Sequence, residues 1–100
     1  MKTSQPPTTI SDGTNRRFFK AIDALIERDK IYSLQSFCDE CNLHAPRYRE
    51  MRLTYGRTPN PLVNSRYKTI EIEALHKLVD KYNISAYWLI TGKGNIFTQS

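Results

Sequence analysis

The stretch SFCDECNLHAPRYREMR, residues 36–52, joins two cysteines at C-x-x-C spacing to an arginine-rich segment. Four apolar residues in and before it follow the i, i+3, i+4, i+7 spacing of one helix face: Leu34, Phe37, Cys38 and Cys41. Ser33, just before them, is a favoured N-cap residue. We therefore predict a short helix over residues 33–41, in which the cysteines pack as small hydrophobic side chains.

Other uses of the cysteine pair fit the sequence less well. A redox-active pair needs a lowered thiol pKa, whereas the neighbouring carboxylates of Asp39 and Glu40 raise it. A structural zinc site usually combines two close pairs of ligands. Here only His44 follows the cysteines closely, and His76 is alone on its predicted helix. We therefore predict no metal site and no cofactor.

The chain that follows fits a second helix after a tight turn. Pro46 suits the first turn of this helix, which is predicted over residues 45–55. Five positions meet the packing needs of a helix-turn-helix: a small residue, a turn residue that accepts positive φ, an apolar plug and two buried residues three apart. They are Cys38, Asn42, Leu43, Tyr48 and Met51. The spacing predicts such a motif over about residues 33–55, with its second helix entering the DNA major groove.

Helical spacing recurs in three further segments. They are residues 14–29 with Thr14 as N-cap, residues 69–82 with Ile72 on the apolar face, and residues 85–91 between Ser85 and Gly92. Residues 1–13 lack periodicity and are predicted to form a flexible N-terminal arm. The only alternating strand candidate is RYKTI, residues 66–70. We predict an all-α, five-helix domain over residues 14–97.

The positive charge of the chain is concentrated in one segment. The net charge is +5, and residues 44–68 hold six basic side chains against the single acid Glu50, so this segment accounts for the whole excess. A concentrated basic segment is typical of proteins that bind polyanions. The charge therefore favours a nucleic-acid partner.

Membrane insertion and secretion are not expected. No apolar run approaches the length of a transmembrane helix, and the N-terminal sequence MKTSQPPTTISDG has no apolar core of a secretion signal. We therefore predict a cytoplasmic protein with no membrane partner.

The C-terminal run YNISAYWLITGKGNIF adds a resemblance. It is similar to the pattern V-S-x-x-W-L-L-T-G-x-G-x-M/F that ends the DNA-binding domain of phage-repressor-type (XRE or lambda-repressor-like) regulators, frequent in Bacteroides-type proteins. The matching residues are Ile84, Ser85, Trp88, Leu89, Thr91, Gly92, Gly94 and Phe97. The resemblance covers residues 16–97. It implies a five-helix lambda-repressor-like fold, sequence-specific binding of double-stranded DNA, and a transcriptional repressor that forms a homodimer.

This chain departs from the family pattern in three places. Asn42 replaces the usual glycine, the segment His44–Pro46 has one residue more before the second helix, and the loop from Gly56 to Thr69 is longer. These departures concern how the second helix is presented to DNA.

The motif predicts which side chains meet the bases. They lie on the second helix away from its buried positions, or at its N-terminal end: His44, Ala45, Arg47, Arg49, Glu50 and Leu53. Arg49 is the first choice for guanine, which arginine contacts with two hydrogen bonds, and Arg47 is the second. Glu50 either accepts a hydrogen bond from cytosine or orients one of these arginines.

Two further sets of residues are predicted. The phosphate-contacting candidates are Gln35, Arg52, Arg57, Arg66 and Lys68, where Arg52 is expected to meet either phosphate or an acid on the core side. The candidates for a dimer surface are the C-terminal apolar residues Tyr87, Ile90, Ile96 and Phe97.

Two other classes of function remain as alternatives. A protein-interaction module of antirepressor or antitoxin type would use the same fold, but its surface would expose apolar groups where residues 44–68 carry arginine. An enzyme is not expected, because no nucleophile has a base beside it and no paired carboxylates lie in an apolar segment. Nothing in the sequence indicates a small-molecule ligand.

Overall fold

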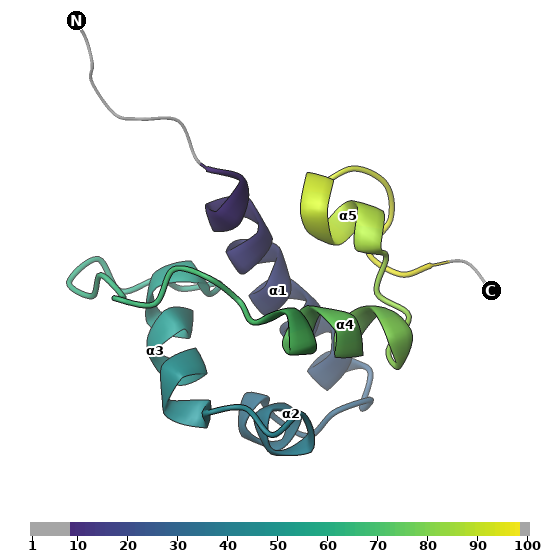
Figure 1. Cartoon of the computed structure of the whole chain (residues 1–100), viewed down its shortest axis with the longest axis horizontal. Coiled ribbons are helices and arrows are strands. Elements are labelled where there is room, and N and C mark those ends of the chain that lie inside the picture. The colour runs from purple at the N-terminus through teal and green to yellow at the C-terminus, as the bar shows by residue number, and fades with distance from the viewer. Residues whose placement is uncertain (1–8, 99–100) are drawn as a thin grey trace, which may run out of the picture.

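The computed structural model describes residues 9–98 and is all-helical (Figure 1). These residues form five α-helices: α1 (Ile10–Glu27), α2 (Leu34–Glu40), α3 (Ala45–Tyr55), α4 (Ile72–Asp80) and α5 (Ala86–Thr91). Among them the only β-type pairing is an isolated antiparallel bridge between Ile84 and Phe97, and residues 66–70, the one alternating segment, form no strand. No helix within residues 9–98 is long and apolar enough to cross a membrane.

Helix α1 begins earlier than the sequence predicted. Thr9, not Thr14, is the N-cap, and its hydroxyl accepts a hydrogen bond from the backbone N–H of Asp12 at 3.0 Å. Thr14 lies inside the helix and is buried. Both threonines are good caps locally, but the earlier one allows another turn of backbone hydrogen bonding. The predicted arm therefore reaches no further than residue 9, and its residues 1–8 lie outside the described residues.

The core is built from the inner faces of all five helices around α1. Figure 1 shows α3 and α5 on opposite sides of α1. Aromatic rings form its centre: Phe18 contacts Phe19 edge to face and lies 5.7 Å from the ring centre of Tyr48. Edge-to-face and tilted ring pairs add to the burial of apolar area. Phe37 of α2 contacts Phe18 in the same way, so three helices meet at one ring cluster.

The turn between α2 and α3 has the local features that the sequence predicted. Ser33 caps α2 in a reciprocal capping box with Ser36. Asn42 takes the left-handed conformation with φ of 58°, and the next N–H, from Leu43, returns to the Cys38 carbonyl at 2.8 Å. This is a helix ending that asparagine tolerates, so glycine is not required at this position.

Helix α3 ends at Gly56, a position that has no room for a side chain. A Cβ atom on Gly56 would lie 2.5 Å from the carbonyl oxygen of Arg52, closer than a carbon atom can approach. The predicted bounds of this helix, residues 45–55, are confirmed.

Helix α4 is shorter than predicted, and one residue of its predicted apolar face lies outside the core. It begins at Ile72, not at residue 69, and Ile72 itself is 70% exposed. The core positions are taken instead by Ile70, which precedes the helix, and by Ala74 and Leu78 within it. The other apolar residues of the predicted face within the helix, Leu75 and Val79, are half-buried and packed against the core.

Helix α5 is fastened to α1 by an arginine. The guanidinium of Arg17 donates from Nε to the Leu89 carbonyl at 2.7 Å and from an Nη to the Ile90 carbonyl at 2.8 Å. A cation at a helix C-terminus also interacts favourably with the helix dipole. Gly92 ends α5 with φ of 80°, and a Cβ there would lie 3.0 Å from the same guanidinium. The T-G-x-G segment is therefore a helix stop packed against Arg17.

Candidate nucleic-acid interface

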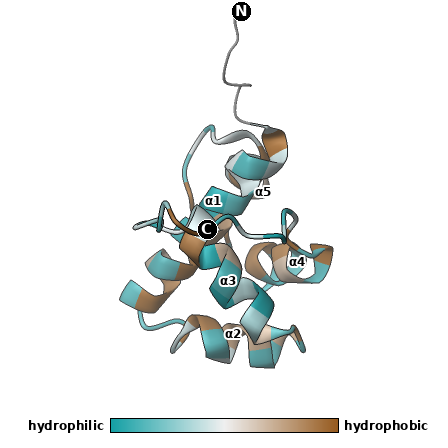
Figure 2. Cartoon of the chain, turned by 90° about the vertical axis from the view of Figure 1, so that its left-hand side faces the viewer, coloured by the Kyte–Doolittle hydropathy of each residue, from teal (hydrophilic) through white to brown (hydrophobic). Residues whose placement is uncertain are grey.

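Helix α3 has three faces with different environments. The core face is buried and consists of Ala45, Tyr48, Met51 and Tyr55. A second face, formed by Arg47, Glu50 and Thr54, is bonded to the loop that leads to α4. The third face is exposed and consists of Pro46, Arg49 and Leu53. Figure 2 shows α3 in front, with hydrophilic residues along the part that faces the viewer.

The exposed face of α3 is connected to the start of α2. An Nη of Arg49 donates to the side-chain oxygen of Gln35 at 2.6 Å, and the amide nitrogen of Gln35 donates to Asp39 at 3.0 Å. Gln35 is the second residue of α2, so the bond crosses the turn between the two helices. The structure thus brings together the predicted guanine-contacting residue and a predicted phosphate-contacting residue, both on exposed positions.

Two more predicted base-contacting residues lie beside this face. His44 is the N-cap of α3, is exposed and makes no side-chain cap hydrogen bond. It stands at the N-terminal end of α3, where the first N–H groups favour negatively charged ligands. Leu53 is 44% exposed, one turn beyond Arg49.

The other three predicted base-contacting residues are engaged inside the protein. Ala45 is 6% exposed and belongs to the core. Glu50 accepts hydrogen bonds from Ser65 Oγ and from the backbone N–H of Arg66, both at 3.2 Å. Arg47 donates to the Thr69 carbonyl at 2.6 Å, and its Nε is buried. None of the three therefore lies on the exposed face of α3: Ala45 belongs to the core, and Arg47 and Glu50 are bonded to the loop.

The loop after α3 is held along its length, and we call residues 60–71 the anchored loop. The Asn60 N–H donates to the Leu53 carbonyl at 2.7 Å, where the loop starts. In its middle, the Ser65 N–H donates to Thr54 Oγ1 at 2.9 Å. At its end, Tyr48 Oη donates to the Glu71 carboxylate at 2.9 Å and accepts from the Glu71 N–H at 3.1 Å.

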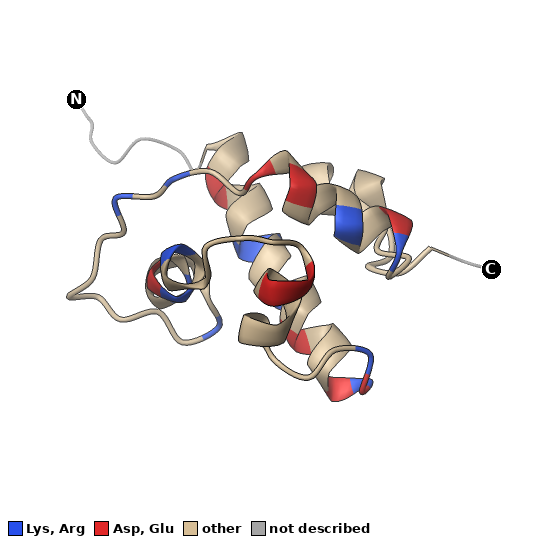
Figure 3. Ribbon diagram, turned by 60° about the horizontal axis from the view of Figure 1, so that its bottom comes forward, with Lys and Arg blue, Asp and Glu red and all other residues tan. Residues whose placement is uncertain are grey.

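The predicted phosphate-contacting cations surround α3. Figure 3, which looks nearly along α3, shows the loop passing around this helix with basic residues near both of its ends. Arg57 is paired with Glu27 at 3.6 Å and Arg66 with Glu50 at 3.9 Å, and both arginines are largely exposed. Lys68 is exposed and donates to Asn64 at 2.8 Å. Exposed ion pairs of this kind contribute little to stability, so these cations can be redirected to another anion.

Arg52 differs from the other cations. Its guanidinium pairs with Asp23 of α1 at 3.1 Å, and both side chains are partly buried, Asp23 more than Arg52. The structure therefore agrees with the alternative in which Arg52 meets an acid on the core side. This pair holds α3 to α1.

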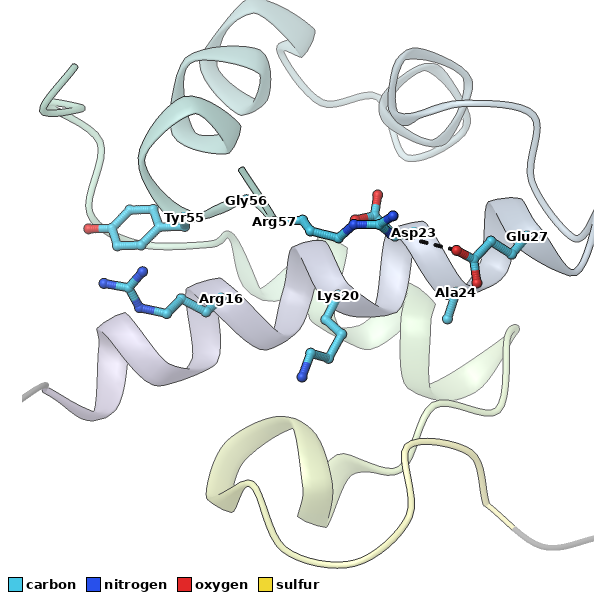
Figure 4. Close-up of a pocket in the computed structure, with 8 residues that line it drawn as sticks. All are labelled: Arg16, Lys20, Asp23, Ala24, Glu27, Tyr55, Gly56 and Arg57. Atoms are coloured by element: carbon cyan, nitrogen blue, oxygen red, sulfur yellow. Dashed lines mark ion pairs between the residues drawn. The ribbon is translucent and has the colours of Figure 1, made fainter. Parts of the chain in front are cut away.

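A groove between α1 and the end of α3 contains several of these charges (Figure 4). It has a volume of about 500 Å³. Arg16 lies over the Tyr55 ring at one end, 5.6 Å from its centre, and the ion pair between Arg57 and Glu27 lies at the other. Because both acidic and basic side chains line it, the groove has no strong preference for either sign of charge.

The cysteines behave as packing residues. Both are free thiols; Cys38 is buried and Cys41 is half-buried. Burial raises the pKa of the Cys38 thiol to about 11, and it also raises that of Cys41. A raised pKa keeps a thiol protonated and unreactive at neutral pH. Among residues 9–98 no group of three His, Cys, Asp or Glu side chains is placed to hold a metal ion.

Of the C-terminal apolar residues predicted to form a dimer surface, two are exposed and two are packed against the core. Tyr87 and Ile90 of α5 are 61% and 46% exposed. Ile96 and Phe97 are packed against the core, and the Arg28 guanidinium covers the Phe97 ring at 3.9 Å from its centre. Only Tyr87 and Ile90 of the four dimer-surface candidates therefore present large exposed apolar groups.

Sequence reasoning missed the residues that hold the anchored loop. Thr54, Ser65 and Asn15 are polar residues that bond the loop to α3 or α1, and Asn15 donates to the Lys68 carbonyl at 2.8 Å. The buried position of Asn15 on the apolar face of α1 was the one available signal. A polar residue at such a position needs a hydrogen-bond partner. Comparisons with family models, with curated proteins and with solved structures found no match to this chain.

Proposed function

We propose that this protein binds double-stranded DNA sequence-specifically through α2, the turn and α3, as a helix-turn-helix of the phage-repressor type. In this proposal α3 enters the major groove and reads bases with the exposed face at Pro46, Arg49 and Leu53, together with His44. The protein would then act as a transcriptional regulator, most simply as a repressor that acts by occupying its binding site on DNA.

The observation that carries the proposal is the bond between Arg49 and Gln35. Arg49 is the one cation on the exposed face of α3 within the described residues, and Gln35 holds its guanidinium from the neighbouring helix. A restrained guanidinium loses less conformational freedom when it binds guanine O6 and N7. Gln35, near the N-terminus of α2, is in turn a suitable phosphate contact.

The distribution of charge supports the same partner. Six basic residues lie in residues 44–68 against one acid, and that acid, Glu50, is turned to the loop. Arg57, Arg66 and Lys68 remain exposed on the loop around α3. Phosphates of DNA beside a helix in the major groove would meet such cations, which release counterions when they bind.

A homodimer is part of the proposal. Helix-turn-helix proteins usually bind pseudo-symmetric sites as dimers. The exposed pair Tyr87 and Ile90 on α5 is the apolar surface that a second copy would cover.

The test is selection of bound duplexes from a random DNA pool, followed by affinity measurements at two salt concentrations. We expect one recurrent palindromic motif. We also expect affinity to fall by at least about a hundredfold between about 50 and 200 mM salt, as four or more phosphate contacts require. Salt-sensitive binding without a motif would contradict sequence specificity. No binding at low salt would overturn the proposal and favour the protein-interaction module.

A further inference from the structure

We infer that Glu50 is a positioning residue, which fixes the anchored loop (residues 60–71) against α3 so that Arg66 and Lys68 form a second, preorganised contact to the DNA backbone. The inference rests on the proposed function for the identity of the partner, but not for the anchoring itself. It differs from the role that the sequence suggested for Glu50, which was contact with a base or with a neighbouring arginine.

Glu50 makes contacts that belong to the loop. A single carboxylate oxygen, Oε2, accepts from Ser65 Oγ and from the Arg66 N–H, both at 3.2 Å, and lies 3.9 Å from Nε of Arg66. Ser65 is 1% exposed, and its Oγ also accepts from the Tyr67 N–H at 3.1 Å. The carboxylate therefore organises a turn of the chain around a buried serine. Hydrogen bonds to a charged acceptor are the stronger kind.

The residues one turn before and one turn after Glu50 on α3 also bond the anchored loop. One turn before it, Arg47 bonds the Thr69 carbonyl, and its guanidinium lies 5.0 Å from the centre of the Tyr67 ring. One turn after it, Thr54 Oγ1 accepts from the Ser65 N–H. Positions 47, 50 and 54 lie on one side of a helix. This side of α3 is thus an attachment surface for the loop.

The anchoring leaves the loop's cations facing outward. The Arg66 side chain is 78% exposed although its backbone N–H is held by Glu50, and Lys68 is exposed although its carbonyl is held by Asn15. Fixing the backbone of a loop before binding removes an entropic cost that a mobile loop would incur on binding. Glu50 would therefore increase affinity for DNA in spite of its negative charge.

Two substitutions of Glu50 separate its charge from its anchoring. Glu50→Gln removes the charge but keeps one oxygen that can accept from Ser65 and Arg66. Glu50→Ala removes both, and alanine is favourable inside a helix, so α3 itself is retained. Ser65→Ala is the matched variant from the loop side, because it removes the buried hydroxyl and leaves the charge of Glu50 unchanged.

Trypsin gives a readout that does not depend on DNA, since Arg66 and Lys68 are its cleavage sites within the anchored loop. We expect cleavage after these residues under native conditions to be about tenfold faster in Glu50→Ala than in the wild type. Ser65→Ala should also be cleaved faster, and Glu50→Gln should stay within about twofold of the wild type. Equal cleavage of Glu50→Ala and Glu50→Gln would overturn the anchoring role.

DNA affinity tests the second half of the inference. Glu50→Gln should bind at least as tightly as the wild type. Glu50→Ala should bind about fivefold more weakly than Glu50→Gln on every duplex, with a salt slope smaller by about 1. A loss confined to one base-pair position would show that Glu50 reads a base, and equal affinity of the two variants would show that it acts only through charge.

The two proposals fail in distinguishable ways. If the wild type binds no DNA but Glu50→Ala is still cleaved faster, the proposed function and the DNA contact of the loop are both overturned while the anchoring stands. If DNA binding is strong and the cleavage rates are equal, the proposed function stands and the positioning role of Glu50 is overturned.

Discussion

Two faces of α3 look alike in sequence and differ in the folded chain. Arg49 lies on the exposed face and donates to Gln35, whereas Arg47, two residues earlier, is turned into the loop, where its Nε is buried. Both arginines belong to the same basic run. The difference arises from residues 65–71, which lie far along the chain and occupy one side of the helix. A charged residue on a helix is therefore available to a ligand where its side chain stays exposed, and not where another segment both bonds and buries it.

The largest effect on stability is expected at Tyr48, which packs α3 on the core and also bonds the end of the anchored loop. Its ring is fully buried, and its hydroxyl is bonded to Glu71 at the end of the anchored loop. Tyr48→Ala should lower the free energy of unfolding by about 3–5 kcal/mol, and Tyr48→Phe by about 1–3 kcal/mol because two polar groups of Glu71 lose their partner. Urea denaturation measures both. A Tyr48→Phe variant as stable as the wild type would show that this bond does not hold the loop.

Substitutions of the two arginines should differ in their effect on the free energy of unfolding. Arg47→Ala removes the bond to the Thr69 carbonyl and the contact with the Tyr67 ring, so we expect a loss of about 1–2 kcal/mol. Arg49→Ala is the matched control and should stay within about 0.5 kcal/mol of the wild type, as exposed substitutions usually do. Equal losses measured by urea denaturation would remove the distinction between the faces.

The two cysteines of the motif also differ in burial: Cys38 is buried and Cys41 is half-buried. Burial raises the Cys38 pKa to about 11. A group whose pKa is raised by folding stabilises the fold below its unfolded pKa and loses that contribution as pH rises toward its folded pKa. The Cys38 thiol should therefore contribute a fall in stability of about 1 kcal/mol between pH 7 and pH 10, and the fall in Cys38→Ala should be smaller by that amount. An unchanged pH dependence in Cys38→Ala would contradict this assignment.

The smallest effect is expected at the edge of the exposed face. Arg57 and Glu27 are both about 70% exposed in their ion pair, so Arg57→Ala should leave stability nearly unchanged. On DNA it should weaken binding to all duplexes alike and reduce the salt slope by about 1. Affinity measured on several duplexes at a series of salt concentrations checks this. A loss limited to one sequence would mean that Arg57 reads a base.

Local signals account for the parts of the fold that could be predicted. Ser33, Gly56, Ser85 and Gly92 begin or end helices within a residue of the predicted bounds, because caps and helix stops depend on neighbouring backbone groups. The start of α1 was missed because two threonines offer the same local signal. Ile72 was assigned to the apolar face of α4 because it fits the helical spacing, but it is the first residue of the helix and is exposed.

The candidate site was predictable only in part, for a different reason. The exposed residues His44, Arg49 and Leu53 follow from the spacing of the buried positions on α3. Nothing local distinguishes Arg47 and Glu50 from them, since their partners are 15 to 22 residues away in a loop without periodicity. Long-range hydrogen bonds of this kind have no counterpart in helical spacing, so the sequence could not show which face of α3 the loop covers.

The most direct test of the difference between the two faces is a specificity profile of the two arginines. Affinity would be measured for the selected duplex and each of its single base-pair variants, with the wild type, Arg49→Ala and Arg47→Ala. Arg49→Ala should lose about 1–3 kcal/mol and become insensitive to one base-pair position, whereas Arg47→Ala should lose affinity evenly across the variants. An even loss for Arg49→Ala, or loss of discrimination at one position for Arg47→Ala, would contradict the assignment of the exposed face to base recognition.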